Sequence, residues 1–483
     1  MQARGYLYAP LVLALLAASG VASAQQAEER DFMMRVREAS PASRAPSDGA
    51  AEGRLGSQQM RRANRVASEL LRRNMAGSRQ DDLELLERAR QAEVIVLRGQ
   101  YDRVQDVLTA LGVNHVVIPP GLLSRQPLMS TQTVMVNCPG YVGSAATERV
   151  QRFVETGGFL VTTDWALAVV ARGFPETIRR GGPATADDVV DVDEVMGDHP
   201  FLEHVRTTDD NLHWWLEGAS YPIRVLDPRR VEVLLSSTEM GRKYREPTIA
   251  ATFRAGEGRV LHTTSHFYLQ QARLSSQRDR AGASAFARDL GLDDRTVQDL
   301  RGRGLDQARV GEVVGAYAMQ QLIANVIVEK RRANDALLSS FSLRAKATAA
   351  LRPVPGPTEE SVGEVHEDFL LRELERRGSE VRVRDLFGRE GWIDASLVEA
   401  RNPPPAEPVG NADPPAVAPT DPIDMTAAAA ILPVQGSGRA ATSACAASGT
   451  AGSRVAWLGL LVALLGIRLR RSFRTPLRGP RRW

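Results

Sequence analysis

The chain has 483 residues, 43% of them hydrophobic, which is enough for one sizeable domain and one small one. Its formal charge of +3 does not indicate nucleic-acid binding. Arg4 and the eight arginines from Arg454 onward lie in terminal segments without acidic residues, so the remainder is mildly acidic. With only two cysteines, Cys138 and Cys445, no disulfide framework is expected.

The first 24 residues have the pattern of a secretory signal peptide. Arg4 precedes an apolar stretch around residues 11–16, and small residues lead up to Ala24, where signal peptidase is expected to cleave. Residues 25–56 are polar and are expected to be disordered. The signal predicts that the chain is exported.

The C-terminal segment, residues 445–483, combines Cys445, an apolar run at 455–467 and seven arginines beyond it. A cationic cluster after an apolar run is typical of a stop-transfer element with its charged end in the cytoplasm. The run is short, covering roughly 20 Å of a hydrocarbon core about 30 Å thick. This order resembles the myxosortase-type (MYXO-CTERM) sorting signal, which implies that a sorting protease cleaves near Cys445 and that the protein moves to the cell surface. The alternative is an ordinary transmembrane helix that anchors the chain in the inner membrane, facing the periplasm.

Residues 57–332 carry alternating helical and strand patterns. Helices are predicted at 58–75 and 81–91, which form a helical lead-in over 57–91. Strands are predicted at 93–97, 115–118, 133–136, 159–163, 231–235, 248–253 and 259–264, with helices at 104–111, 146–156 and 313–329. This alternation predicts an α/β domain over 92–332 with a doubly wound, mainly parallel sheet. Residues 271–307 have weak periodicity and are expected to be a mobile insertion.

Several motifs of this domain resemble the class I glutamine amidotransferase-like fold, which is flavodoxin-like. They are Val134-Met135-Val136-Asn137-Cys138-Pro139-Gly140, Phe159-Leu160-Val161, Gly256-Glu257-Gly258-Arg259-Val260 and Ser265-His266. In that family the nucleophilic Cys occupies a tight turn after a strand, and here that turn reads Thr163-Asp164-Trp165-Ala166. Only Thr163 offers a hydroxyl, and Phe267-Tyr268 follows His266 where the family has Pro-Glu. The resemblance therefore implies the fold without the catalytic triad.

The carboxyl ends of the predicted strands should meet at one edge of the sheet, where open α/β folds bind ligands. The residues expected there include Asp102, Cys138, Tyr141, Asp164, Trp165 and His266. Cys138, His266 and Asp164 could serve as nucleophile, base and orienting carboxylate. Free cysteines are, however, often simply buried. A polar or sugar-binding pocket without chemistry is the competing hypothesis, with Asp102, Tyr141, Trp165 and Trp215 as its candidate residues.

Two other clusters are weaker candidates for binding sites. In His213-Trp214-Trp215, adjacent Trp side chains should point to different sides, so one is expected to fill the core and the other to cover the edge pocket. The acidic run at 187–199 has oxygen ligands that Ca²⁺ prefers, but its spacing matches no loop motif. No metal site and no cofactor are predicted.

Residues 343–401 are predicted to form a separate unit. Leu351-Arg352-Pro353-Val354-Pro355-Gly356-Pro357 and Gly388-Arg389-Glu390-Gly391-Trp392-Ile393 resemble a bacterial SH3-like domain, a small β-barrel that often binds peptidoglycan or peptide. The Pro- and Ala-rich residues 402–444 should form an extended stalk. We expect a non-catalytic envelope protein that binds peptidoglycan, a glycan or a protein partner. The alternative is a cell-wall or glycan hydrolase that uses Cys138, His266 and Asp164.

Overall fold

The structure is a computed structural model that describes residues 55–89, 93–206, 208 and 210–401. The predicted signal peptide with Ala24, the stalk, Cys445 and the apolar run at 455–467 lie outside these residues. Within the described residues, no helix is long and apolar enough to cross a membrane. The chain divides into two compact units after Ala416, and every described residue belongs to the first of them.

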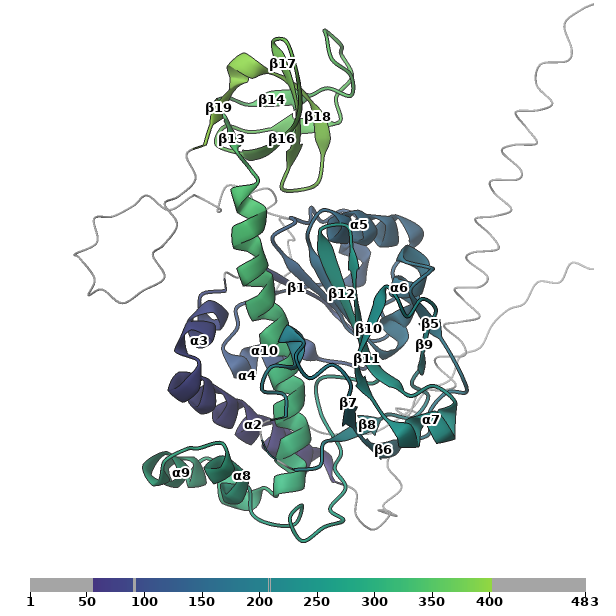
Figure 1. Ribbon diagram of the computed structural model, residues 1–483, viewed down its shortest axis with the longest axis vertical. Helices are drawn as coiled ribbons and strands as arrows, with labels where there is room; N and C mark the ends of the chain where they lie inside the picture. The colour runs from purple at the N-terminus through teal and green to yellow at the C-terminus, as the bar shows by residue number, and fades with distance from the viewer. Residues whose placement is uncertain (1–54, 90–92, 207, 209, 402–483) are drawn as a thin grey trace, which may run out of the picture. The chain divides into compact units, whose positions relative to one another are not determined.

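The main sheet confirms the predicted α/β class with a mainly parallel centre (Figure 1). Its parallel strands stand in the order β2-β1-β3-β4-β12. Beyond β12 the sheet continues through β11, β10 and β7, which pair in antiparallel fashion. The bounds are β1 Val94–Leu97, β2 Val116–Ile118, β3 Thr133–Val136, β4 Phe159–Thr163, β7 Asp193–Glu194, β10 Val231–Ser236, β11 Thr248–Ala255 and β12 Gly258–Thr263.

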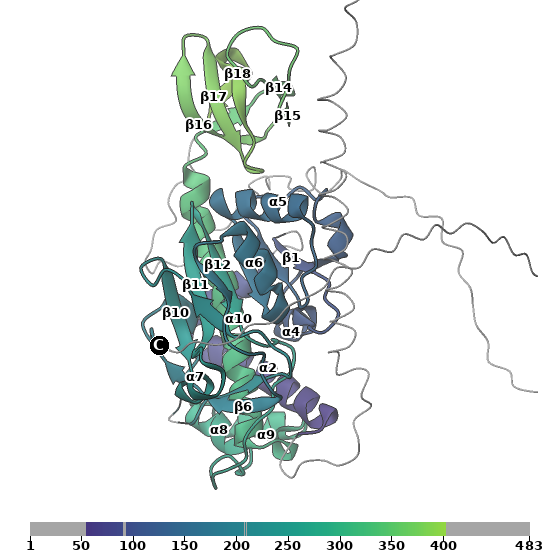
Figure 2. The ribbon, with the colours of Figure 1, turned by 90° about the vertical axis from the view of Figure 1, so that its right-hand side faces the viewer.

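Helices cover both faces of this sheet (Figures 1 and 2). Alternate strand residues point to opposite faces, so Val94 and Val96 enter one core cluster while Ile95 and Leu97 enter the other. The first cluster includes residues of α2 (Ser57–Ser78), α3 (Gln80–Glu87), α4 (Val104–Leu111) and α10 (Val310–Ser339). The second includes residues of α5 (Ser144–Glu155) and α6 (Leu167–Gly173). The three-layer arrangement explains the near-continuous apolar strands of the centre.

Several predicted elements agree with the structure within a few residues, and β3, β4 and α4 match their predicted bounds. The last helix of the domain is the clearest difference, because α10 spans 30 residues whereas the sequence predicts a helix only over 313–329. Most of its first two-thirds is buried on all sides. A helix buried all round lacks an amphipathic period, so its ends are hard to locate from the pattern.

Residues 271–307, predicted to be a mobile insertion, contain ordered helices. These are α8 (Ser284–Asp289) and α9 (Asp294–Arg301). Phe286, Val297 and Leu300 are buried in the same core cluster as α10, and Phe286 meets Tyr317 edge to face with ring centroids 5.4 Å apart. The few apolar residues of this segment are enough to dock it, although charged residues mask their periodicity.

Short strands missed by the sequence analysis lie outside the parallel centre. They are β5 (Ile178–Arg180), β6 (Asp188–Asp191), β8 (His213–Leu216) and β9 (Ile223–Val225), and α7 (Thr238–Tyr244) follows β10. β6 and β8 pair only with each other, whereas β9 joins β5 to β11. β5, β6 and β9 mix charged and apolar residues over three or four positions, so they lack the continuous apolar run that marks β1 and β3.

Residues 343–401 form a small antiparallel β domain. Its five-stranded sheet has the order β18-β17-β16-β13-β19, and β14 pairs with β15. The bounds are β13 Leu343–Ala345, β14 Ala349–Leu351, β15 Gly363–Val365, β16 Leu370–Arg377, β17 Glu380–Asp385, β18 Glu390–Asp394 and β19 Val398–Ala400. Trp392 is buried, as the predicted barrel requires. The SH3-like assignment itself stays a prediction.

Lys330 of α10 ties this helix to the sheet. Its ammonium group donates hydrogen bonds to the carbonyl oxygens of Ser130 at 2.7 Å and Gly157 at 2.8 Å, just before β3 and β4. The side chain is 2% exposed. Burial lowers the pKa of Lys330 to about 7, although Glu93 opposes this effect.

The buried lysine predicts a stability change at alkaline pH. Between about pH 7 and 10.5 the unfolded chain binds a proton at Lys330 that the folded chain does not, so the free energy of unfolding should rise with pH. Relative to Lys330→Met, the wild type should gain about 1 kcal/mol per pH unit across the middle of this range. Denaturant unfolding at several pH values measures the difference, and a difference that does not vary with pH would mean that Lys330 stays protonated when folded.

Candidate functional site

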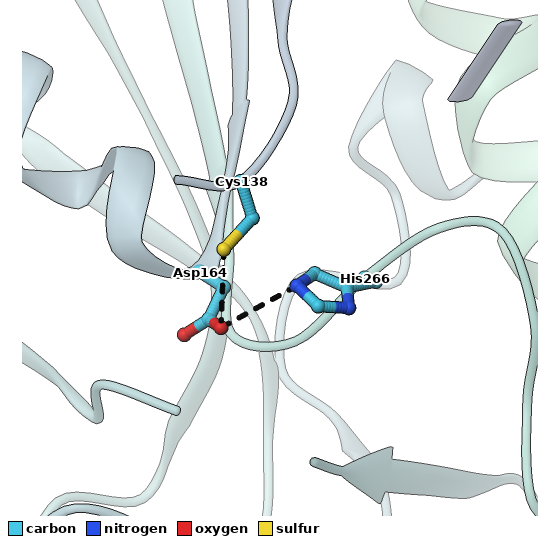
Figure 3. Close-up of side chains that lie close together, drawn as sticks. All are labelled: Cys138, Asp164 and His266. Atoms are coloured by element: carbon cyan, nitrogen blue, oxygen red, sulfur yellow. Dashed lines mark hydrogen bonds and ion pairs between the residues drawn. The ribbon is translucent and has the colours of Figure 1, made fainter. Parts of the chain in front are cut away.

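Cys138, Asp164 and His266 converge at the carboxyl edge of the parallel sheet (Figure 3). They follow β3, β4 and β12, three strands that are neighbours in the sheet. Cys138 Sγ lies 3.6 Å from Asp164 Oδ2, and His266 Nε2 lies 3.5 Å from the same oxygen. All three side chains are buried. The sequence analysis expected this meeting because the three residues follow strands whose carboxyl ends should share one edge of the sheet.

Asp164 occupies the tight turn that the resemblance assigns to a nucleophile. It follows β4 directly, has a φ of 46°, and opens a 3₁₀ turn (Asp164–Ala166) that leads into α6. A positive φ is uncommon outside glycine, and Asp is among the residues that tolerate it best. The turn therefore presents a carboxylate to the edge of the sheet.

The Thr163 hydroxyl, at the start of this turn, helps to hold the strand ends together. Its Oγ1 donates to Asp102 Oδ2 at 2.8 Å and accepts from the Cys138 backbone N–H at 3.2 Å. Asp102 itself is fully buried and also accepts from the Arg103 backbone N–H at 2.7 Å. Asp102, predicted to face a pocket, thus braces the loops at the edge of the sheet.

Glu217 is the site residue that the sequence analysis missed. It follows β8, and its Oε1 lies 2.6 Å from His266 Nδ1. Its backbone N–H donates to Ser265 Oγ at 3.3 Å, which fixes the two segments side by side. Glu217 stands next to the Trp pair in the sequence, but nothing in its spacing links β8 to the end of β12. Only tertiary structure makes this contact.

The surroundings of Cys138 and His266 shift the pKa values of both groups upward. Burial and the neighbouring Asp164 carboxylate raise the pKa of the Cys138 thiol to about 12, against the opposing effect of His266. Burial alone would lower the pKa of His266, but Glu217, Cys138 and Asp164 together raise it well above its usual range. These shifts favour the protonated forms of both Cys138 and His266, and burial raises the pKa of Glu217 as well.

Aromatic side chains cover the cluster. Trp165 stacks on Tyr221 with ring centroids 5.7 Å apart and meets Tyr101 edge to face at 5.5 Å. Its indole N–H donates to the Ala219 carbonyl at 2.7 Å. Trp165 is 6% exposed, whereas Tyr101, Tyr141 and Tyr221 are half-buried. Of the predicted pocket residues, Tyr141 is partly exposed at this edge of the sheet, whereas Trp165 is buried.

Trp214 and Trp215 separate as predicted, but Trp215 does not join this cluster. Trp214 fills the core and donates to the Thr264 carbonyl at 2.9 Å. Trp215 packs instead against a small group that contains Leu55 and Met60, and its indole N–H donates to Asp187 at 2.6 Å. The alternation of β8 sends it to the other side of the strand.

Two carboxylates of the acidic run at 187–199, those of Asp188 and Asp191, have cationic partners. Lys243 bridges Asp188 at 2.7 Å and Glu239 at 2.8 Å, and Arg273 lies 3.5 Å from Asp191. His213 Nε2 lies 3.2 Å from Asp191 as well. Within the described part of the chain, the run forms ion pairs and not a ligand cage.

No protein-family model matches the chain, and no curated protein matches it either. Solved structures that resemble it include an exo-β-1,4-mannosidase from Opitutaceae bacterium strain TAV5, a β-galactosidase from Rahnella and a glutamine amidotransferase from Thermotoga maritima. Their sequence identities to this chain are 14%, 16% and 13%.

The mannosidase, β-galactosidase and amidotransferase matches cover 39%, 37% and 50% of this chain, with TM-scores of 0.25, 0.27 and 0.30. They cover 33%, 29% and 99% of the other proteins, so the chain spans a third or less of the two glycosidases. Scores of this size carry no argument about family or function. The fold class rests on the strand order described above.

The state of the thiol predicts that Cys138 is unreactive in the folded protein. A thiol with a pKa near 12 is almost wholly protonated at pH 8, and Cys138 is also 1% exposed. Iodoacetamide should label it at least 100-fold more slowly in buffer than in denaturant, as followed by peptide mass spectrometry. A Cys445→Ser background removes the second thiol, and labelling in buffer at the rate of a free thiol would contradict the geometry.

Proposed function

We propose that this chain is an exported envelope protein, anchored at the membrane or the cell surface, whose amidotransferase-like α/β domain binds a cell-envelope polymer without catalysis. The expected ligand is peptidoglycan or another glycan. An envelope protein partner is the alternative ligand. The observation that carries the proposal is Asp164 in the turn where the resembled family has its nucleophile. A carboxylate in that place cannot form the thioester of glutamine hydrolysis.

Two further observations support a binding role. The Cys138 thiol is buried, which raises its pKa to about 12, and the Thr163 hydroxyl is engaged between Asp102 and Cys138. The half-buried rings of Tyr101 and Tyr141 pack against the cluster and offer apolar faces with polar tips. Such rings suit stacking on sugar. Tyr221 is less available, because its ring stacks on Trp165 and the Arg180 guanidinium lies 4.1 Å from its centroid.

The rest of the proposed layout comes from the sequence. The signal peptide would direct export through signal peptidase, and the C-terminal segment would either anchor the chain in the membrane or pass it to a sorting protease. The stalk at 402–444 would give the folded part reach. The small β domain, if SH3-like in function as well as in pattern, would add a second contact with the wall.

The alternative function is a cell-wall or glycan hydrolase with Cys138 as nucleophile, His266 as base and Asp164 as orienting group. The convergence of the three side chains favours it. The pKa and burial of Cys138 count against it, because the thiolate is the nucleophile. Rapid labelling of Cys138 in the folded chain, together with release of soluble wall fragments, would favour the hydrolase.

A sedimentation assay with purified peptidoglycan and a glycan array tests the binding role. The full chain, purified in mild detergent, should bind, and the double variant Tyr101→Ala/Tyr141→Ala should bind about tenfold more weakly, because each lost ring contact is worth about 0.5–1.5 kcal/mol. Phe387→Ala, which removes a half-buried ring from the small β domain, is the matched control and should bind normally.

Each reverse result has a defined meaning. Loss in Phe387→Ala with normal binding by the Tyr variant would move the ligand to the small β domain. Absence of binding by the wild type to every polymer tested would contradict the polymer role and leave the protein-partner role. Circular dichroism of each variant confirms that it is folded.

A further inference from the structure

The ligand-type atoms of Cys138, Asp164 and His266 form a compact buried group. The sulfur, one carboxylate oxygen and one imidazole nitrogen all lie within 4.8 Å of one another. We propose that Cys138 Sγ, Asp164 Oδ2 and His266 Nε2 form a three-ligand site for a thiophilic divalent cation, with zinc as the ion that fits best. The cation site is independent of the proposed polymer binding, and each can fail without the other.

The distances suit a tetrahedral ion. Zinc lies about 2.3 Å from a thiolate and about 2.0–2.2 Å from nitrogen and oxygen ligands, so neighbouring ligands of a tetrahedral zinc stand roughly 3.3–3.8 Å apart. The sulfur–oxygen distance here is 3.6 Å and the nitrogen–oxygen distance is 3.5 Å. The sulfur and the nitrogen lie within 4.8 Å of each other, so a cation would draw them together by up to about 1 Å.

His266 provides an independent sign of a ligand. Its side chain is 5% exposed, and Nε2 has no hydrogen-bond partner among the residues that the structure describes. Asp164 Oδ2, at 3.5 Å, is beyond the usual N–H···O range of about 2.7–3.2 Å. A buried polar nitrogen without a hydrogen bond needs an explanation, because leaving it unsatisfied costs free energy. A cation would satisfy it.

Glu217 places the imidazole for this role. It lies 2.6 Å from Nδ1, on the other side of the ring from Nε2. Metal-binding histidines usually donate their second N–H to a carboxylate or carbonyl, which fixes the tautomer and the ring orientation. With Nδ1–H donated to Glu217, Nε2 faces Cys138 and Asp164, and its lone pair becomes available to a cation once the Nε2 proton leaves. Glu217 is thus a positioning residue and not a ligand.

The donor set selects the kind of cation. Ca²⁺ and Mg²⁺ take oxygen ligands, whereas sulfur, nitrogen and oxygen together are typical of zinc. On binding, the metal–sulfur bond forms as the S–H bond breaks, and the proton of Cys138 leaves to solvent. Any proton on Nε2 leaves likewise, so no electrons are transferred. Three protein ligands leave one position of a tetrahedral ion for water or a bound group.

The site also has a rigid frame. Its ligands follow three neighbouring strands, and the Thr163 hydroxyl links the Cys138 backbone to Asp102. The loop after β1 closes over Cys138, where the backbone N–H groups of Gln100 and Tyr101 donate to the Cys138 carbonyl at 3.0 and 3.2 Å. This approach requires Gly99, since a Cβ there would clash with the Cys138 carbonyl oxygen.

Cobalt substitution tests the proposal directly. The purified full chain is stripped with a chelator and titrated with Co²⁺, which reports a thiolate ligand through a near-ultraviolet charge-transfer band. We expect one Co²⁺ per chain, displacement by Zn²⁺, and mass-spectrometric detection of one Zn²⁺ per chain after dialysis. The matched control is Cys445→Ser, which should keep the band, whereas Cys138→Ser should lose it.

The positioning role of Glu217 has its own readout. Glu217→Gln should keep the band but weaken Co²⁺ binding about 10–100-fold, as expected for loss of a carboxylate behind a histidine ligand. Glu217→Gln leaves all three ligands in place. Its weaker Co²⁺ binding would therefore still test the site if Cys138→Ser does not fold. A wild-type chain, shown to be folded by circular dichroism, that binds no stoichiometric Co²⁺ or Zn²⁺ would overturn the proposal. So would a band that persists in Cys138→Ser.

Discussion

The parallel pairing of β12 with β4 is the constraint on which the site depends. Thr163 of β4 stands opposite Thr263 of β12 although about a hundred residues separate them in the chain. Because the strands run in the same direction, both end at one edge, and Asp164 and His266 emerge there side by side. The pairing of β3 with β4 adds Cys138 in the same way. Without this register, the three side chains would be remote from one another.

The central strands of the fold could be predicted because they carry strong local signals. β3 and β4 are short apolar runs bounded by turn residues, and their ends located Cys138 and Asp164. The short antiparallel strands could not be predicted in this way. β8 is one such strand, and Glu217 reaches His266 through contacts of β8 with the segment that follows β12. The sequence therefore predicted Cys138, Asp164 and His266 as site residues, but it did not predict Glu217.

The position of the Asp164 carboxylate determines which protonation states of Cys138 and His266 are favoured. In a buried site a carboxylate stabilises a neighbouring cation and disfavours a neighbouring anion. Asp164 in the tight turn therefore suppresses the Cys138 thiolate and supports a protonated His266, which is the opposite of an activated nucleophile. The same arrangement becomes favourable once a divalent cation replaces the protons. Binding functions, of a polymer at the tyrosine surface and of a cation beneath it, are consistent with this balance.

The state of the His266 ring is the most direct test of this charge balance. Nitrogen-15 NMR of the chelator-treated chain, with histidine labelled selectively and His266→Gln used for assignment, measures both its protonation and its pKa. Glu217 and Asp164 should keep the ring protonated well above pH 6.5, with Nδ1–H in a strong hydrogen bond. A ring that is neutral at about pH 7 and titrates no higher than an ordinary histidine would contradict this balance.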